Sequence, residues 1–149
     1  MKITVEGFAD DGEIPSEFTC DGEGMRPAIS WEGEPVGTQS FALSVIDYDV
    51  PKHLRPDGIW HHWLVANIPP LVHAIPGSKA AVPGEQVKNS YARGEWGGPC
   101  PPDKRHRYFF TIYALNIGKL TGLTKDNFTA EVEKRALAKA QVIGTYERK

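Results

Sequence analysis

The segment DYDVPKHLRPDGIWHHWLVANIPP, residues 47–70, concentrates side chains that could do chemistry. It contains the carboxylates Asp47 and Asp49 and two adjacent imidazoles, and a second histidine-containing run, HRYFFTIYAL, follows from residue 106. Imidazoles and carboxylates serve as general acids and bases, as metal ligands and as partners of charged ligands. The chemistry therefore depends on which of these residues meet in space.

Three pairs of these side chains are two residues apart: Asp47 with Asp49, Trp60 with His62, and His106 with Tyr108. Residues two apart in a strand point to the same face, so each pair is expected to share a face. Each pair lies at a strand end beside a loop rich in Gly or Pro. We therefore predict that the three pairs meet at one rim of a sheet. The same alternation places His61 on the opposite face, with Trp63 and Val65.

Each pair also has a purely structural explanation. Asp-x-Asp before a proline is common turn chemistry, because Asp caps turns through its own backbone. His62 inside an apolar strand can be a hydrogen-bonded core residue, and Trp60 can belong to the core. The coincidence of three polar pairs, each at a strand end, favours a pocket.

Period-two alternation in KITVEGF, SFALSVIDYD, WHHWLVANI and RYFFTIYAL predicts strands. The late segment 124–144 predicts a helix with Thr124 or Asp126 as N-cap and Gly144 as its stop, followed by a short strand in TYERK. We therefore predict one β-rich domain over residues 1–149, a Greek-key β-sandwich with one or two C-terminal helices.

Residues 71–105 show little periodicity, and irregular connections longer than about 15 residues are uncommon in compact domains. This segment includes Val82, Tyr91 and Trp96, which make it too apolar for a disordered linker. We expect an ordered excursion over the body of the protein, the kind of loop on which binding sites are built.

The composition argues against several classes of function, although Lys104, Arg105 and Arg107 leave a local basic loop. The formal net charge of −2 gives no basic field for nucleic acid, no apolar run approaches the roughly 20 residues of a membrane span, and the N-terminus has no apolar signal core. These features predict a cytoplasmic protein. Cys20 and Cys100 lack metal-site spacing, so two free thiols are the favoured interpretation. Both lie in Gly/Pro/Asp-rich loops, which leaves a bridge between them as the alternative.

The runs DYDVP, WHHWLVANIP and GGPCPPDKRHRYFFTIYAL resemble the signature regions of the phosphatidylethanolamine-binding proteins, also called the Raf kinase inhibitor-like family. IPSEFTCDGEGMRPAISWEGEPVGTQSFAL resembles the N-terminal segment of the bacterial and archaeal branch. The resemblance covers the chain from about Phe8 to its end. Tyr48 stands where the family usually has Pro, and strand alternation predicts that it points away from Asp47.

The resemblance implies a sandwich-like fold with an anion pocket at one end. The ligands that it implies are phosphate, acetate or a phospholipid head group. It further implies regulatory partners such as kinases or proteases, frequent homodimers among bacterial and archaeal members, and no established catalysis for most members. We expect no cofactor and no metal. The pocket residues that it implies are Asp47, Asp49, Trp60, His62, the Gly98–Pro99 turn, His106 and Tyr108.

Two adjacent carboxylates would repel an anion, so something must offset their charge. Protonated His62 or His106 could do so, as could a neutral Asp, with the Gly97–Gly98 backbone N–H groups and Tyr108 as further donors. We therefore expect anion binding to take up a proton. The opposite solution is an amine held by ionised aspartates and aromatic rings. Phosphoethanolamine could use both halves of such a pocket.

Two other classes of function stay open. Asp49 orienting His62, with His106 as a second acid or base, contains the parts of a small hydrolase, and the same groups could bind a divalent metal. No G-x-S-x-G motif supplies a nucleophile, and Cys100 stands among prolines. An inhibitor of a kinase or protease could instead dock through the loops KHLRPDG and PPDKRHR.

Overall fold

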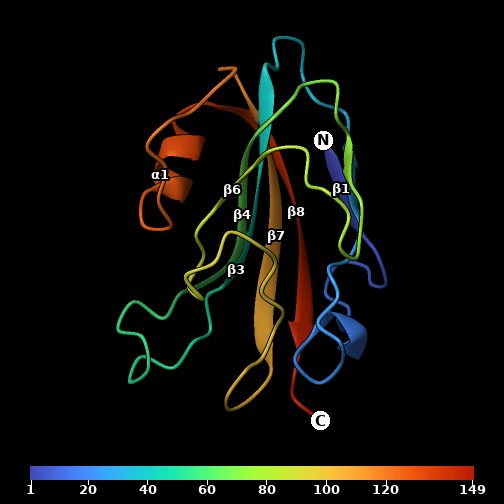
Figure 1. The fold of residues 1–149 in the computed structure, drawn as a ribbon, viewed down its shortest axis with the longest axis vertical. Helices are drawn as coiled ribbons and strands as arrows, with labels where there is room; N and C mark the ends of the chain where they lie inside the picture. Colours follow the sequence, from blue (N-terminus) through green and yellow to red (C-terminus); the bar gives the residue numbers. More distant parts are fainter.

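The computed structural model describes residues 1–149 as two antiparallel sheets, a 3-10 turn at Ser16–Phe18 and one short helix, α1 (Phe128–Glu133) (Figure 1). The larger sheet contains, in spatial order, β6 (Glu85–Val87), β4 (Trp60–Ile68), β3 (Ser40–Asp47), β7 (His106–Leu115) and β8 (Ala136–Tyr146). The smaller contains β1 (Lys2–Val5), β2 (Ile29–Glu32) and β5 (Ala74–Ile75). No helix has the length and hydropathy to cross a membrane.

The larger sheet is the middle of three layers, with β1 on one side and α1 on the other in Figure 1. Eighteen buried residues, most of them from the two sheets, form the main core, including Trp31 of β2 and Phe110 of β7. Seven more form a second core between the other face of the larger sheet and α1. Because both faces are covered, all eight residues of β3 are buried. The predicted mainly-β fold with a C-terminal helix is confirmed.

The predicted helix over residues 124–144 is wrong in its extent. α1 ends at Glu133, and residues 136–146 form β8, which pairs with β7 along its whole length. Burial alternates along Ala136 to Gln141, as a strand with one solvated face requires. Alanine and lysine have high intrinsic helix propensity, but the ladder with β7 outweighs it. Gly144 lies inside the strand, where a Cβ would come within 2.6 Å of Ile14 and Phe8.

A β-bulge interrupts β4 where the site begins. Val45 pairs with Trp63, but the next residue, Ile46, pairs with His61, so β4 contains one extra residue, His62. As predicted, His61 and His62 face opposite sides of the sheet. The predicted placement of Trp63 and Val65 with His61 is wrong, because the bulge turns both towards the main core, on the side of His62.

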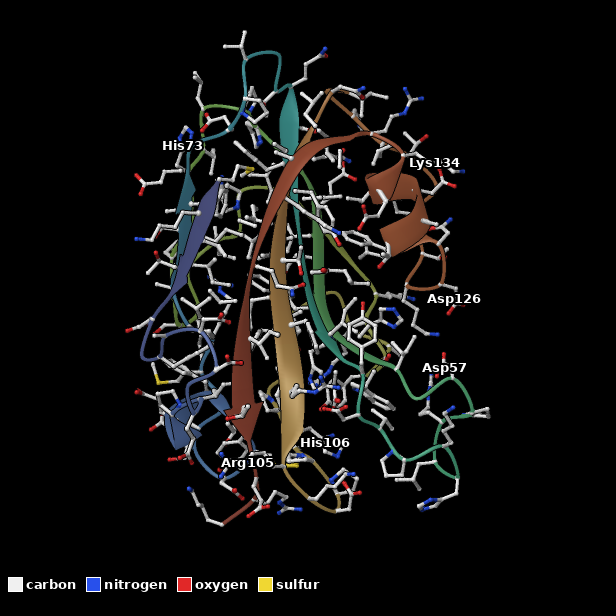
Figure 2. The ribbon with its side chains drawn as sticks, turned by 180° about the vertical axis from the view of Figure 1, so that it is seen from behind. Asp57, His73, Arg105, His106, Asp126 and Lys134 are labelled. Carbon is white, nitrogen blue, oxygen red and sulfur yellow. A yellow bond between two sulfur atoms is a disulfide. The ribbon has the colours of Figure 1, made fainter.

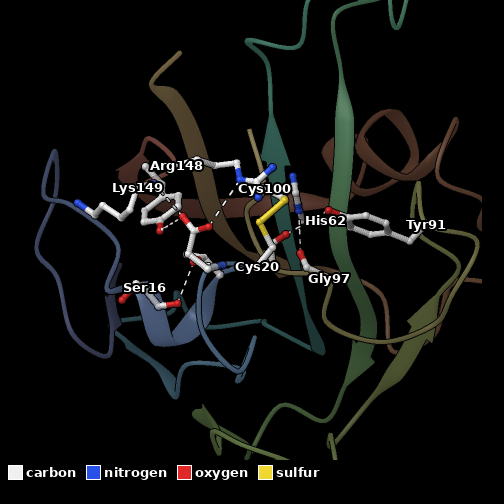
Figure 3. Close-up of a disulfide and its surroundings, with 12 residues drawn as sticks. Ser16, Cys20, His62, Tyr91, Gly97, Cys100, Arg148 and Lys149 are labelled. Carbon is white, nitrogen blue, oxygen red and sulfur yellow. Dashed lines mark hydrogen bonds and ion pairs between the residues drawn. A yellow bond between two sulfur atoms is a disulfide. The ribbon is translucent and has the colours of Figure 1, made fainter. Parts of the chain in front are cut away.

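The segment 71–105 is ordered, as predicted. It contains β5 and β6 and then crosses the main core, against which Val82 and Trp96 pack. The favoured interpretation of two free thiols is wrong, since Cys20 and Cys100 form a disulfide, which lies beside His62 and Gly97 (Figure 3). Spacing could not indicate this bond, because the fold brings together two loops that are 80 residues apart.

We expect the disulfide to stabilise the fold by closing a long loop in the unfolded chain. Chain-entropy arguments give about 4 kcal/mol for the 80-residue separation. The double variant Cys20→Ser/Cys100→Ser should therefore lose up to that much free energy of unfolding in urea denaturation. A thiol assay on denatured, unreduced wild-type protein provides the control. Two reactive thiols before reduction would contradict the bond.

Candidate functional site

Five of the residues predicted from the sequence meet at one end of the larger sheet, where β3 ends and β4 and β7 begin: Asp47, Trp60, His62, His106 and Tyr108. Asp47 is paired with Trp60 on one side and Tyr108 on the other, so the three side chains emerge on the same face. In Figure 2 the label of His106 marks this end of the sheet, and Lys134, which follows α1, lies towards the opposite end of the molecule. The predicted gathering of these side chains is confirmed; their role in binding stays a prediction.

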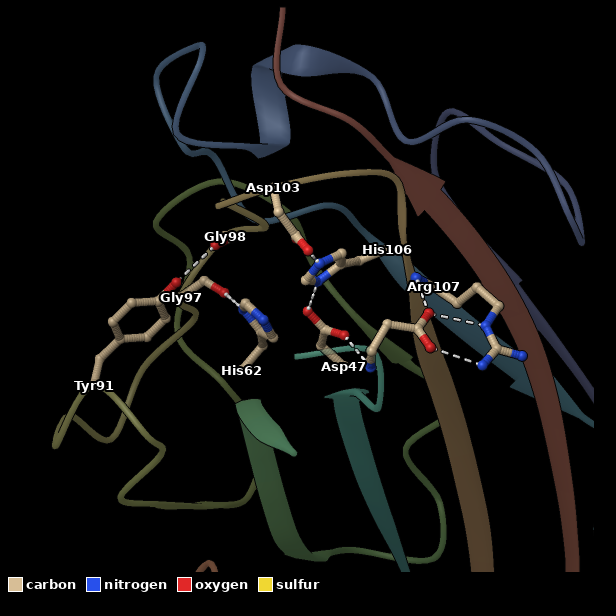
Figure 4. A network of polar contacts seen from close by, with 9 residues as sticks. Asp47, His62, Tyr91, Gly97, Gly98, Asp103, His106 and Arg107 are labelled. Atoms are coloured by element: carbon tan, nitrogen blue, oxygen red, sulfur yellow. Dashed lines mark hydrogen bonds and ion pairs between the residues drawn. The ribbon is translucent and has the colours of Figure 1, made fainter. Parts of the chain in front are cut away.

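His106 lies fully buried between two carboxylates (Figure 4). Its Nδ1 is 2.6 Å from Oδ2 of Asp47, and its Nε2 is 2.6 Å from Oδ1 of Asp103. A neutral imidazole can donate only one hydrogen bond, whereas the imidazolium donates two. Burial alone would lower the pKa of His106, but the two carboxylates outweigh burial and raise it. His106 is therefore the cation of the site.

His62 is in the opposite state. Its Nδ1 lies 2.7 Å from the carbonyl oxygen of Gly97, which can only accept, so Nδ1 carries the hydrogen. Burial lowers the pKa of His62 to about 4, although the Gly97 carbonyl opposes this. The imidazole is therefore neutral at pH 7, with the lone pair of Nε2 free of any protein partner. Of the two histidines expected to supply positive charge, only His106 does so.

Aromatic side chains enclose the space around His62. The Tyr108 ring lies 5.2 Å from the His62 ring, and Tyr91 lies 5.8 Å from His62 and 5.2 Å from Trp60. The Tyr108 hydroxyl and the Trp60 Nε1 are both buried without a hydrogen-bond partner. Unsatisfied buried donors are uncommon in native proteins and need a reason, such as a role in binding.

The site is almost closed in this state. Asp47 and His62 are each 3% exposed, and His106 and Tyr108 are fully buried. The 42% exposed side chain of Asp103 covers the outer nitrogen of His106. A ligand that reaches Tyr108 must therefore displace a side chain, and Asp103 is the exposed one in direct contact with the cluster.

Three of the predicted site residues do not line this cluster. Asp49 lies beyond the end of β3 and binds Arg107 through both carboxylate oxygens, at 2.8 and 2.9 Å, so it does not share the face of Asp47. The Arg107 guanidinium lowers the pKa of Asp49. Gly98 and Pro99 contribute through the backbone, since their carbonyls accept from the Tyr91 hydroxyl and the Cys20 N–H.

The Gly97 N–H, which we expected to donate to an anion, donates instead to the His62 carbonyl. A Cβ at Gly97 would overlap the Tyr91 ring. Glycine therefore serves here to let the loop approach β4 closely. Tyr48 packs its ring on Phe109 at 5.0 Å, away from the cluster as predicted, and the chain has no cis peptide bond.

Sequence reasoning missed Asp103, Tyr91 and Asn89 as parts of the site. The Asn89 Nδ2 donates to the carbonyls of His62 and Glu95, and its Oδ1 accepts from the Tyr91 N–H, so it holds the loop over the site. Only Asp103 could have been found from the sequence, as the acidic residue three positions before His106. No group of three or more His, Cys, Asp or Glu side chains is arranged to hold a metal ion, so the metal alternative gains no support.

Comparison with known proteins supports the resemblance seen in the sequence. The profile of the family described as phosphatidylethanolamine-binding protein matches residues 4–147. A Chlamydia pneumoniae relative described as a UPF0098 protein is 37% identical, with 99% of each chain covered. The crystal structure of a Chlamydia trachomatis protein, described as a putative homologue of the family, has a TM-score of 0.90 at 34% identity, with 99% of this chain and 97% of the other covered. Escherichia coli YbcL has a TM-score of 0.89 at 28% identity, with 99% and 98% covered.

The contrasting states of the two histidines can be tested by NMR. We expect the His62 imidazole to titrate near pH 4 and the His106 imidazole above 6.5, its ordinary value. Asp103→Asn removes one carboxylate and should lower the pKa of His106, while that of His62 stays unchanged. A His62 that titrates between roughly pH 6 and 7, as an exposed histidine does, would contradict the low pKa that its burial implies.

Proposed function

The chain belongs to the phosphatidylethanolamine-binding protein family, and we propose that it binds a small anion, such as phosphate or a phospholipid head group, at the cluster around His62 and His106. The single observation that carries this proposal is the pair of buried donors without partners, the Tyr108 hydroxyl and the Trp60 Nε1. The Tyr108 ring lies beside the His62 ring, and Trp60 lies beside Tyr91, which also contacts His62. One ligand with several acceptor atoms could therefore accept from both donors.

The charges of the site make this binding depend on pH. The positive charge of His106 is already neutralised by Asp47 and Asp103. An anion beside His62 would meet a lone pair on Nε2, unless that nitrogen gains a proton. The ligand therefore either donates a hydrogen bond, as a protonated phosphate can, or raises the pKa of His62 from about 4 by supplying negative charge.

The proposed role is binding without catalysis. Both cysteines are joined in the disulfide, and His62 and His106 are each held by fixed partners. No side chain in the cluster is therefore a prepared nucleophile. A lack of phosphoester hydrolysis by the purified protein would agree with this proposal, whereas turnover lost in His62→Ala would overturn it.

The cytoplasmic location expected from the sequence stays a prediction. The Cys20–Cys100 disulfide weighs against it, because such bonds persist mainly in oxidising compartments and are rare in the cytosol outside hyperthermophiles.

We expect the affinity for sulfate to fall at least tenfold between pH 5.5 and 8. Binding takes up a proton at any pH between the empty-state pKa of His62, about 4, and its higher bound-state pKa, so affinity falls as pH rises through that window. Sulfate keeps one charge state over this range, unlike phosphate. Calorimetry in buffers of different ionisation enthalpy measures the proton uptake. In the same assay, His62→Ala should abolish binding and His61→Ala, on the opposite face, should spare it.

The matched histidine variants also test the strand register. Equal affinities at pH 5.5 and 8 without proton uptake would overturn the protonation of His62. Equal loss of binding in both folded variants would overturn the placement of the ligand on one face of β4.

A second candidate function, docking to a partner such as a kinase or protease, is favoured by the loop that connects β3 and β4. Leu54 on this loop is 53% exposed, and the adjacent Arg55 guanidinium lies 5.2 Å over the Trp60 ring, which links the loop to the site. The homodimer implied by the resemblance stays a prediction that light scattering tests.

We expect Leu54→Glu to weaken partner capture in a pull-down, with sulfate changing the amount captured by wild-type protein. Val36→Glu, at a fully exposed apolar residue between β2 and β3, is the matched control. Capture that both variants reduce equally, or neither reduces, would exclude docking through this loop.

A further inference from the structure

We propose that a large cavity beside Arg26 is a second ligand site, for a monocarboxylate that carries an apolar chain. The cavity has a volume of about 1320 Å³ and lies between the segment 19–26 and the segments 78–82 and 91–100. This volume exceeds that of many sites for drug-sized ligands. None of Asp47, His62 and His106 lines it, so the proposal goes beyond the anion site described above.

The feature that defines the ligand is a buried arginine without an acidic partner. Arg26 lines the cavity and is only 8% exposed, yet it takes part in no ion pair. Its Nε and Nη2 donate to the Pro76 carbonyl at 3.1 and 2.5 Å, and Nη2 also donates to the Ala80 carbonyl at 2.8 Å. The guanidinium lies 5.4 Å over the Trp63 ring. One nitrogen, Nη1, is left without a protein acceptor.

A guanidinium held in this way keeps an uncompensated charge. Buried charges are normally paired, because their removal from water is otherwise costly. The two carbonyls fix the position of Arg26 but carry no net charge. A ligand carboxylate at Nη1 would supply the missing countercharge, and charge-assisted hydrogen bonds of this kind are among the stronger ones in proteins.

Other spare N–H groups in the cavity point to the same class of ligand. The Trp96 Nε1 is buried without an acceptor. The Gln86 Oε1 already accepts from the Trp63 Nε1 at 2.7 Å, which leaves the Gln86 amide N–H groups free. Together with Nη1 of Arg26 these are all donors, so they match a ligand rich in acceptors.

Charges at the rim do not cancel that of Arg26. Arg93 and Glu95 form an ion pair with each other at 3.3 Å, and the exposed Glu23 and Lys79 are of opposite sign. The lining residues therefore keep one net positive charge, that of Arg26.

The walls supply the apolar half of the site. Met25, Val82 and Trp96 line the cavity and pack against the main core, and the Cys20–Cys100 disulfide lies on its border. An alkyl chain on these walls would cover apolar surface that is now partly open to water. A charged head at Arg26 and a chain on these walls describe one amphiphilic ligand.

Calorimetry with decanoate, held below its micelle concentration, tests the proposal. Decanol has the same chain without the charge, and acetate has the charge without the chain. We expect wild-type protein to bind decanoate at least tenfold more tightly than either. Arg26→Gln should lower decanoate affinity about tenfold, whereas Lys79→Gln, which removes the same charge at the rim, should change it less than twofold. Equal binding of decanoate and decanol by wild-type protein, or equal effects of the two variants, would overturn the proposal.

Further variants keep the test decisive. If circular dichroism shows that Arg26→Gln does not fold, Ala81→Trp fills the cavity from an exposed position and should weaken decanoate binding; unchanged affinity would overturn the proposal. His62→Ala should leave decanoate binding intact while it removes sulfate binding. Loss of both would mean that decanoate occupies the anion site, and so would overturn the second site.

Discussion

The buried contact between His106 and Asp47 is the interaction on which the site depends. Burying two charges is unfavourable unless their geometry is good and their remaining polar atoms are satisfied. Here both conditions hold, because the second oxygen of Asp47 accepts from the Asp49 N–H at 2.7 Å and the second nitrogen of His106 meets Asp103. The contact joins the end of β3 to the start of β7, and it thereby sets where Tyr108 stands.

Environment gives the two buried histidines opposite states. His62 faces a carbonyl and aromatic rings and is neutral, whereas His106 faces two carboxylates and is charged. The segment that contains Gly97 and Gly98 separates the site of these histidines from the large cavity, since it contacts His62 and also lines the cavity. A single irregular segment therefore forms one wall of both.

Strand alternation was enough to predict which ends of β3, β4 and β7 meet, because period two fixes the face of each side chain. It failed where the chain departs from regular pairing. Asp49 lies past the end of β3, and the bulge at His62 reverses the face of Trp63. The helix predicted through Gly144 is wrong because residues 136–146 pair with the edge of β7, and local helix propensity takes no account of such pairing. Tyr91 and the Cys20–Cys100 bond lie in irregular loops. No local sequence pattern indicates that these loops approach β4.

The bulge at His62 also determines which changes of sequence the site could tolerate. A shift of one residue in a strand moves its side chains to the other face. The bulge absorbs such a shift, because its extra residue has no partner on β3, so deletion of His62 would leave Trp60 opposite Asp47 and Trp63 opposite Val45. The His62 imidazole therefore stands on a residue that the pairing of β4 does not require, so a single insertion or deletion here could add or remove this group of the site while the fold persists.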